Sequence, residues 1–164
     1  MLYEALTGIT NPIILRKWSN KAPYVTGVDI ITSDVYNLAY GQIVYIGQYE
    51  GHYLVDIKSN NNEVLRYCNL NYVNVQPASY IREGTKIGTA QKYVHIEYVT
   101  SWRGDSVFPV RINDLTYYKQ DPQDVLDGVY TVVPTATLDY AAHDKLNPVE
   151  YTEEQKAEFT GGKW

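Results

Sequence analysis

The strongest constraint on the fold is a series of short runs rich in Val, Ile and Tyr, separated by Gly or Asn, that extends from Val25 to Val99. Residues of this kind favour the pleated, half-buried surface of a β-sheet over a helix. The Asn-rich segment 59–62 lies between two alternating runs and predicts a β-hairpin, because Asn tolerates the positive φ that such turns require. The predicted strands are Val28–Thr32, Gln42–Gln48, His52–Lys58, Glu63–Asn69, Lys86–Gly88 and Lys92–Thr100. We therefore predict a domain that is mainly β.

The length of 164 residues suits one domain with a short appendage. We expect an N-terminal lead-in over residues 1–23, a β domain over residues 24–127 and an extended tail with a short helix over residues 128–164. The tail either wraps its own domain, reaches a partner or is a frayed terminus. Its Phe159 and Trp164 favour docking, because apolar side chains hold a terminus in place.

Two short helices are expected in the C-terminal third of the chain. Asp121 and Pro122 predict a single helical turn, with Asp121 as its cap and Pro122 at its first helical position. Thr152 and Gln155 have the spacing of a capping box, which predicts a helix over Glu153–Phe159. A helix of this length is marginal by itself, so it must dock on other structure to persist.

Composition excludes several functions. The formal charge is −5 and the chain has no cluster of Lys and Arg, so it lacks the concentrated positive charge that nucleic-acid binding requires. No apolar run approaches the roughly 18 residues of a membrane span. The N-terminus has no basic region followed by an apolar run, so we expect no signal peptide. A single Cys excludes an internal disulfide framework.

The order of the glycines and strands resembles that of a known family. The residues concerned are Gly27-Val28-Asp29, Gly41–Gly47, Tyr67-Cys68-Asn69-Leu70, Gly84-Thr85-Lys86-Ile87-Gly88 and Tyr93-Val94-His95-Ile96-Glu97. Together they are similar to the motifs His-x-Gly-x-Asp, Tyr-x-His-Leu, Gly-x-x-Ile-Gly and His-x-His-x-Glu of the lysostaphin-type zinc metallopeptidases (peptidase family M23), which cleave peptide cross-bridges in peptidoglycan. The resemblance covers about residues 24–126. It implies an antiparallel β-sheet or β-sandwich of the lysostaphin-type (duplicated-hybrid-motif-like) fold with a C-terminal extension.

The resemblance also indicates that the catalytic site is degenerate. It places the three zinc ligands of the family at Val25, Asp29 and His95, and Val25 has no lone pair to offer a metal. It places the two assisting histidines at Asn69 and Tyr93; Asn cannot act as a base, and Tyr, with an ordinary pKa near 10, can at most donate a hydrogen bond. We therefore predict a chain that is not an enzyme and holds no zinc or other cofactor. Asp29 and His95 then remain as a hydrogen-bonded pair of vestigial ligands.

Other residues offer little for a rebuilt metal site. His52 is expected on a different strand and His143 in the tail, so neither is placed near Asp29 by the sequence. Cys68 is the neighbour of Asn69, and neighbouring side chains in a strand point to opposite faces. The sequence therefore favours Cys68 as a small core residue over a thiolate ligand.

A degenerate fold of this kind suggests first a non-catalytic structural or interaction module. The chain has 17 Tyr and only 2 Phe, and Tyr is enriched at protein interfaces. A wall-related fold without a visible export signal points to a bacteriophage. We therefore expect a virion component of the tail or baseplate, docked through residues 128–164 onto other virion proteins or onto copies of itself, and otherwise a cytoplasmic protein.

Two alternatives remain. The chain is a module that binds cell-wall glycan or peptide without cutting it, with Tyr24, Tyr93, Tyr98 and Trp102 as the binding residues and Trp18 as a further candidate. Otherwise it is an active zinc endopeptidase with non-standard ligands.

Overall fold

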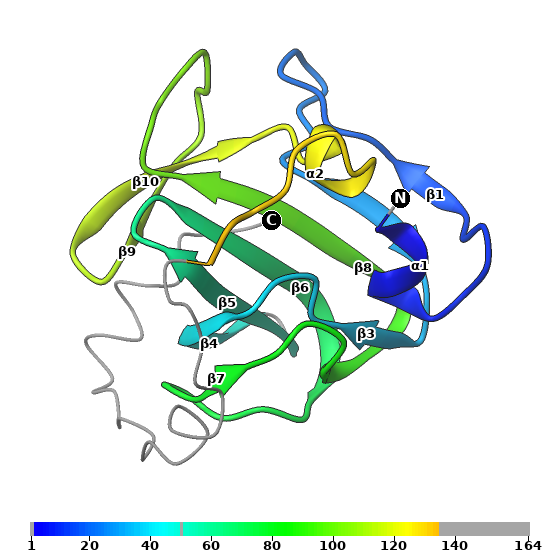
Figure 1. Ribbon diagram of the computed structural model, residues 1–164. Coiled ribbons are helices and arrows are strands. Elements are labelled where there is room, and N and C mark those ends of the chain that lie inside the picture. Colours follow the sequence, from blue (N-terminus) through cyan, green and yellow to red (C-terminus); the bar gives the residue numbers. More distant parts are fainter. Residues whose placement is uncertain (1, 50, 135–164) are drawn as a thin grey trace.

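The computed structural model describes residues 2–49 and 51–134, and these fold around one antiparallel sheet (Figure 1). The elements are α1 (Tyr3–Thr7), β1 (Ile14–Arg16), β2 (Val28–Ile31), β3 (Asp34–Tyr36), β4 (Gly41–Tyr49), β5 (His52–Asn60), β6 (Glu63–Val73), β7 (Tyr80–Ile81), β8 (Lys86–Thr100), β9 (Pro109–Ile112), β10 (Leu115–Gln120) and α2 (Gln123–Leu126). The strands run in the order β1-β2-β8-β6-β5-β4-β7, and β8 also pairs with β3 and β10. The mainly β, antiparallel fold predicted from the sequence is confirmed.

Strand β8 is the centre of the sheet, because it pairs with β2, β3, β6 and β10. The sequence predicts two separate strands here, Lys86–Gly88 and Lys92–Thr100, and that prediction is wrong. Thr89 and Ala90 continue the ladder by pairing with β6, whose register shifts absorb the irregular stretch. The strand is therefore held continuous by its neighbours and not by local propensity.

The two faces of the sheet differ in what they bury. One face, which we call the helix face, carries Ile96 and Tyr98 of β8 in an apolar core that includes Leu6 of α1 and Leu126 of α2. Figure 1 shows both helices over this side of the sheet. The opposite face, which we call the polar face, carries His95 and Glu97, because side chains alternate along a strand. It is closed in part by a second apolar cluster that involves the β9–β10 hairpin.

The β9–β10 hairpin is an element that was not predicted from the sequence. Its turn residues Asn113 and Asp114 have φ of 50° and 65°. An Asn-Asp pair between two runs rich in β-branched and aromatic residues is a recognisable hairpin signal. The predicted lead-in likewise contains α1 and the edge strand β1, and neither has a strong local pattern of its own.

The C-terminal part of the chain is described as far as Pro134. Helix α2 begins at Gln123, one residue later than predicted. The Asp121 carboxylate accepts a hydrogen bond from the backbone N–H of Gln123 at 2.9 Å. The first part of the tail packs on the domain: Val132 is buried in the apolar core. The predicted helix over residues 153–159 lies outside the described residues. Among those described, no helix is long and apolar enough to cross a membrane.

Candidate functional site

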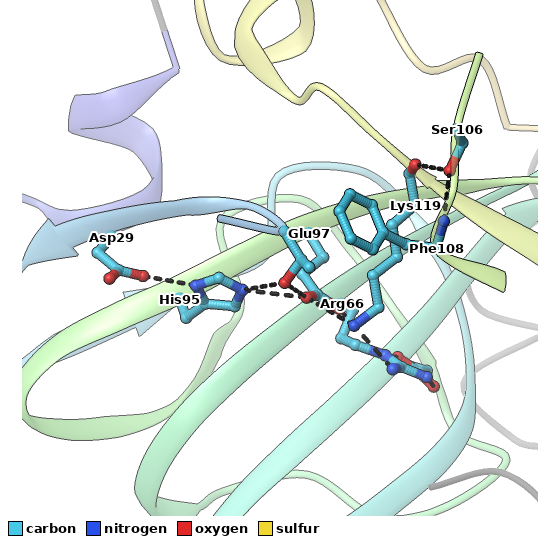
Figure 2. Close-up of polar contacts among 9 residues, drawn as sticks. Asp29, Arg66, His95, Glu97, Ser106, Phe108 and Lys119 are labelled. Carbon is cyan, nitrogen blue, oxygen red and sulfur yellow. Dashed lines mark hydrogen bonds and ion pairs between the residues drawn. The ribbon is translucent and has the colours of Figure 1, made fainter. Parts of the chain in front are cut away.

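The site is built where β2 and β8 lie side by side on the polar face. Asp29 and His95 are cross-strand partners, and Asp29 Oδ1 lies 2.5 Å from His95 Nδ1 (Figure 2). Glu97 follows His95 by two residues along β8, and its carboxylate oxygen Oε2 lies 3.0 Å from His95 Nε2. Thr26 donates from its hydroxyl to the same Glu97 oxygen at 2.6 Å. All these side chains except Thr26, which is half-buried, are buried.

Close approach of the backbone at Gly27 makes this arrangement possible. A Cβ atom at position 27 would lie 2.2 Å from the carbonyl oxygen of Ile96 and 2.9 Å from His95 Nε2. Real Cβ atoms do not approach other atoms so closely, so a side chain here would displace the imidazole or the strand. The glycine of the first motif therefore sets the space in which His95 lies.

The network continues from Glu97 across the sheet into a second ion pair. Glu97, Arg66 and Asp56 are cross-strand partners on three adjacent strands, β8, β6 and β5. Arg66 donates to both carboxylate oxygens of Asp56, at 2.7 and 3.0 Å, and its Nη1 lies 3.8 Å from Glu97 Oε1. Lys119 of β10 reaches Glu97 Oε2 with its Nζ at 3.0 Å. Figure 2 shows Glu97 between His95 on one side and Arg66 and Lys119 on the other.

At the other end, Arg16 of the edge strand β1 closes the network. Its Nε lies 2.6 Å from Asp29 Oδ2, and Arg16 is the register partner of Asp29. The Arg16 side chain is 58% exposed, whereas Asp29 is 1% exposed. One oxygen of the Asp29 carboxylate is thus held by His95 and the other by a cation that faces solvent.

The mutual positions of these groups decide their charge. Burial opposes protonation of His95, but its contacts with Asp29 and Glu97 outweigh burial and raise its pKa. Burial would raise the pKa of Glu97, but Lys119, His95 and Arg66 hold that pKa far below its ordinary value. The same balance, with His95 and Arg16 as the partners, lowers the pKa of Asp29.

With His95 protonated, the buried network is charge-balanced. Its three carboxylates, Asp29, Glu97 and Asp56, face three buried cations, His95, Arg66 and Lys119. Burying an unpaired charge is costly, and this pairing offsets part of that cost. At Asp56, burial raises the pKa of the carboxyl more than Arg66 lowers it. Arg16 adds a further positive charge from the solvent side.

The donor atoms of this network do not fit a zinc ion. A zinc ligand must offer a free lone pair, and catalytic zinc sites have three protein ligands. Both oxygens of Asp29 and both nitrogens of His95 are engaged by other protein groups. The third family position is Val25, whose backbone forms a bridge with Ser19. Among the described residues, no cluster of three His, Cys, Asp or Glu side chains is arranged to hold a metal.

The two positions that correspond to the assisting histidines have structural contacts. Asn69 lies at an irregularity of β6 with φ of 66°, and its amide donates to the carbonyl oxygen of Tyr93 at 2.9 Å. Tyr93 is half-buried on β8. Of the alternative ligands, His52 is on β5, paired with Tyr49, and His143 lies outside the described residues.

Cys68 is a core residue, but the reason given from the sequence is wrong. It is the register partner of His95, so its side chain lies on the polar face. The irregularity at Asn69 breaks the simple alternation on which the prediction rested. Cys68 is fully buried against Tyr45 and Leu54, and burial raises the pKa of its thiol well above the ordinary value.

The predicted aromatic binding residues are not all brought together, because only Tyr98 and Trp102 are neighbours. Tyr24 packs edge-on against Phe108, with ring centroids 5.6 Å apart, in a cluster that also contains Trp18. Tyr98 packs against Trp102 at 6.3 Å, and Tyr98 belongs to the helix face. Tyr93 is on the polar face by alternation. The set of four is therefore divided between the two faces and cannot form one binding surface.

Sequence reasoning missed five members of the network: Arg16, Thr26, Asp56, Arg66 and Lys119. A usable signal was present for two of them. Asp56 and Arg66 each stand between two apolar residues in a strand, as Glu97 does, and this pattern places a charge on a buried face. Such a charge needs a partner on a neighbouring strand.

No protein-family model matches the chain, and no curated protein matches it in sequence. Solved structures do share its fold. The antimicrobial peptidase lysostaphin from Staphylococcus simulans is similar with a TM-score of 0.58 and 18% identity, over 82% of this chain and 62% of lysostaphin. A mutant of the catalytic domain of the prophage-encoded M23 protein EnpA from Enterococcus faecalis is similar with a TM-score of 0.52 and 13% identity, over 70% of this chain and 92% of that domain.

A structure of the SpoIIQ–SpoIIIAH pore-forming complex is also similar, with a TM-score of 0.53 and 14% identity, over 73% of this chain and 87% of the matched chain. The chain therefore has the lysostaphin-type M23 fold, as the motif order predicted. It spans less than two thirds of the lysostaphin chain, at 62%.

Proposed function

We propose that the chain is a non-catalytic interaction module built on the M23 peptidase fold. One observation carries the proposal: every donor atom of Asp29 and His95 is already bound to another group of the protein. These are the two family ligand positions that keep a ligand-type residue. A carboxylate on one nitrogen, like Glu97 on His95 Nε2, is compatible with a zinc site. Zinc also needs the other nitrogen and an Asp29 oxygen, but here His95 Nδ1 and Asp29 Oδ1 bind each other while Arg16 binds Asp29 Oδ2.

The charges around the pair support the same proposal. Arg16 places a guanidinium 2.6 Å from Asp29, and the contacts of His95 favour its protonated form, which has no lone pair for a metal. Zinc binding would require Arg16 to leave the Asp29 carboxylate and His95 to lose its proton. A fixed ion-pair network thus replaces the metal as the link between β2 and β8.

The interaction part of the proposal is supported by the fold and by the tail. One similar structure is that of a protein complex, and another is a prophage-encoded protein. In this chain, residues 128–134 leave α2 and run over the helix face, where Val132 is buried. We propose that the remainder of the tail docks the domain onto other proteins of a phage tail or baseplate, or onto further copies of itself.

Absence of peptidase activity is tested with dye-labelled peptidoglycan from several Gram-positive hosts. The full chain is incubated with and without added zinc, and a His95→Ala variant is the matched control. We expect both proteins to release no more dye than buffer. Release by the native chain that chelator and His95→Ala both abolish would overturn the proposal and establish the endopeptidase alternative.

The setting is tested separately, by mass spectrometry of purified phage particles and by sedimentation with isolated cell walls. We expect the chain in the particles at a fixed stoichiometry to tail or baseplate proteins. Absence from particles together with sedimentation on cell walls would replace the virion setting with the wall-binding alternative. The zinc and activity results stand independently of either outcome.

A further inference from the structure

A cavity on the helix face combines aromatic rings with carboxylates and contains no basic side chain. Its volume is about 420 Å³, and it is lined by Tyr98, Trp102, Asp121, Asp124, Val125 and Tyr130. The cavity is unrelated to the Asp29–His95 pair, which lies on the opposite face of the sheet. It needs an explanation of its own, because exposed aromatic side chains and unpaired carboxylates are seldom gathered at one place by packing alone.

The aromatic walls are held in fixed positions. The Tyr98 ring contacts both others, with its centroid 6.3 Å from that of Trp102 and 6.4 Å from that of Tyr130. The hydroxyls of Tyr98 and Tyr130 donate to the two oxygens of the buried Glu63 carboxylate, so the rings cannot turn freely. Trp102 is 46% exposed and Tyr130 is 42% exposed, so both rings remain accessible to a ligand.

The backbone around the rings is also fixed. The carbonyl oxygen of Trp102 accepts hydrogen bonds from the Thr100 hydroxyl and from the Gln120 amide, each at 2.8 Å. The carbonyl oxygen of Asp124 accepts from the backbone N–H groups of Val129 and Tyr130, at 2.9 and 3.0 Å. A preformed cavity loses little conformational entropy when a ligand binds.

The carboxylates at the rim are available. Asp121 uses Oδ1 to cap α2, and no described side chain forms an ion pair with either Asp121 or Asp124. Both residues are exposed. Two negative charges next to the exposed rings of Trp102 and Tyr130 create a site of negative potential.

We infer that this cavity binds an alkylammonium group, of the kind presented by a lysine side chain of a partner peptide. A cation attracted to the exposed ring faces and to two carboxylates fits this lining, and its methylene chain can pack against the rings. A carboxylate or phosphate ligand would be repelled by Asp121 and Asp124. A sugar would use the rings but would not need two negative charges. The inference goes beyond the proposed function, because a peptidase and an inactive module could equally carry this site.

The probe is Nα-acetyl-lysine methylamide, titrated into the full ¹⁵N-labelled chain at low salt and followed by NMR. Its Nε-acetylated form is the matched neutral probe. With the charged probe alone, we expect saturable changes in chemical shift at Trp102 and residues 124–130. Added salt should weaken this binding. Equal binding of the neutral probe would overturn the inference, as would an absence of shifts at these residues.

Variants locate the binding. Trp102→Ala should weaken the charged probe about three- to tenfold, in line with the loss of one cation–π contact and its covering surface. The pair Asp121→Asn and Asp124→Asn should weaken it about tenfold or more and remove the salt dependence. The control pair Asp105→Asn and Asp114→Asn removes two exposed charges elsewhere and should leave binding unchanged. If both double variants weakened probe binding equally, the effect would come from net charge alone, and the proposed site would be overturned.

Two further titrations exclude other occupants. Tri-N-acetylchitotriose should cause no shifts at Trp102; shifts that survive Asp121→Asn with Asp124→Asn would assign the cavity to a glycan instead. The tail contains Lys145, Lys156 and Lys163, which carry the same ammonium group. Changing all three to Gln in the full chain would strengthen probe binding about tenfold or more if the chain's own tail occupied the cavity. That result would overturn the inference of an external partner. We expect no such increase.

Discussion

Arg16 binds one carboxylate oxygen of Asp29, and His95 binds the other. The Arg16 Nε to Asp29 Oδ2 distance is 2.6 Å, and the His95 Nδ1 to Asp29 Oδ1 distance is 2.5 Å. The Asp29 carboxylate is therefore bound on both sides by groups that favour its negatively charged form. This relationship depends on the edge strand β1, which lies outside the region that resembles the family motifs.

Zinc content tests the consequence of this contact. Protein prepared without a metal-binding tag should contain well below one zinc per chain, because two engaged ligands are too few for a stable site. The double change Val25→His with Arg16→Ala should raise zinc affinity, since it supplies a third ligand and frees Asp29 Oδ2. Val25→His alone is the control and should gain less. A full equivalent of zinc in the native chain, lost on Asp29→Ala, would contradict the proposal of a degenerate site.

Loss of Lys119 should destabilise the fold. Lys119→Met leaves the buried Glu97 carboxylate short of a cation, and breaking a buried pair from one side typically costs about 3–5 kcal/mol. The double change Lys119→Met with Glu97→Gln should recover part of that loss. Denaturant unfolding measures both.

The control for this prediction is Lys86→Met, which breaks the surface pair with Asp34 at 3.0 Å. Surface pairs contribute little to stability, so the unfolding midpoint should not move. A Lys119→Met protein as stable as the native chain would show that solvent reaches Glu97 and that the network is not closed.

A side chain at position 27 should also be costly. In Gly27→Ala, the new Cβ meets the Ile96 carbonyl at 2.2 Å, so β2 or β8 must shift. Overpacking of this kind typically costs about 1–3 kcal/mol, and the displaced imidazole adds to it. The control is Gly51→Ala, where nothing lies within 4 Å and only the φ of 82° is unfavourable. Equal losses of stability for the two variants would mean that position 27 has no special spatial constraint.

The thiol of Cys68 should not react in the native protein. It is fully buried and its pKa is raised well above the ordinary value, so almost no thiolate is present at neutral pH. Titration with a thiol-reactive dye should detect no cysteine in native buffer and one after denaturation. Fast labelling of the native chain would place Cys68 in an accessible site and reopen its role as a ligand.

The strands of the sheet centre and the order of the family motifs were predicted from the sequence, because both depend on local properties. Alternating apolar residues, turn-forming Asn and motif glycines are visible without knowledge of distant contacts. The motif order also predicted that Asp29 and His95 would be the ligand-type residues left at the family positions. The continuity of β8 was not predicted from the sequence, since it depends on pairing with four other strands.

The network around the pair depended on tertiary structure. The sequence of β1 gives no sign that Arg16 will reach Asp29, because β1 and β2 are brought together only by sheet pairing. Lys119 meets Glu97 because β10 pairs with β8, although β9 lies between them in the chain. A sequence therefore shows which family positions carry ligand-type residues. Only the folded sheet shows which charged groups surround Asp29 and His95, because buried charges pair with groups that are close in space and not along the chain.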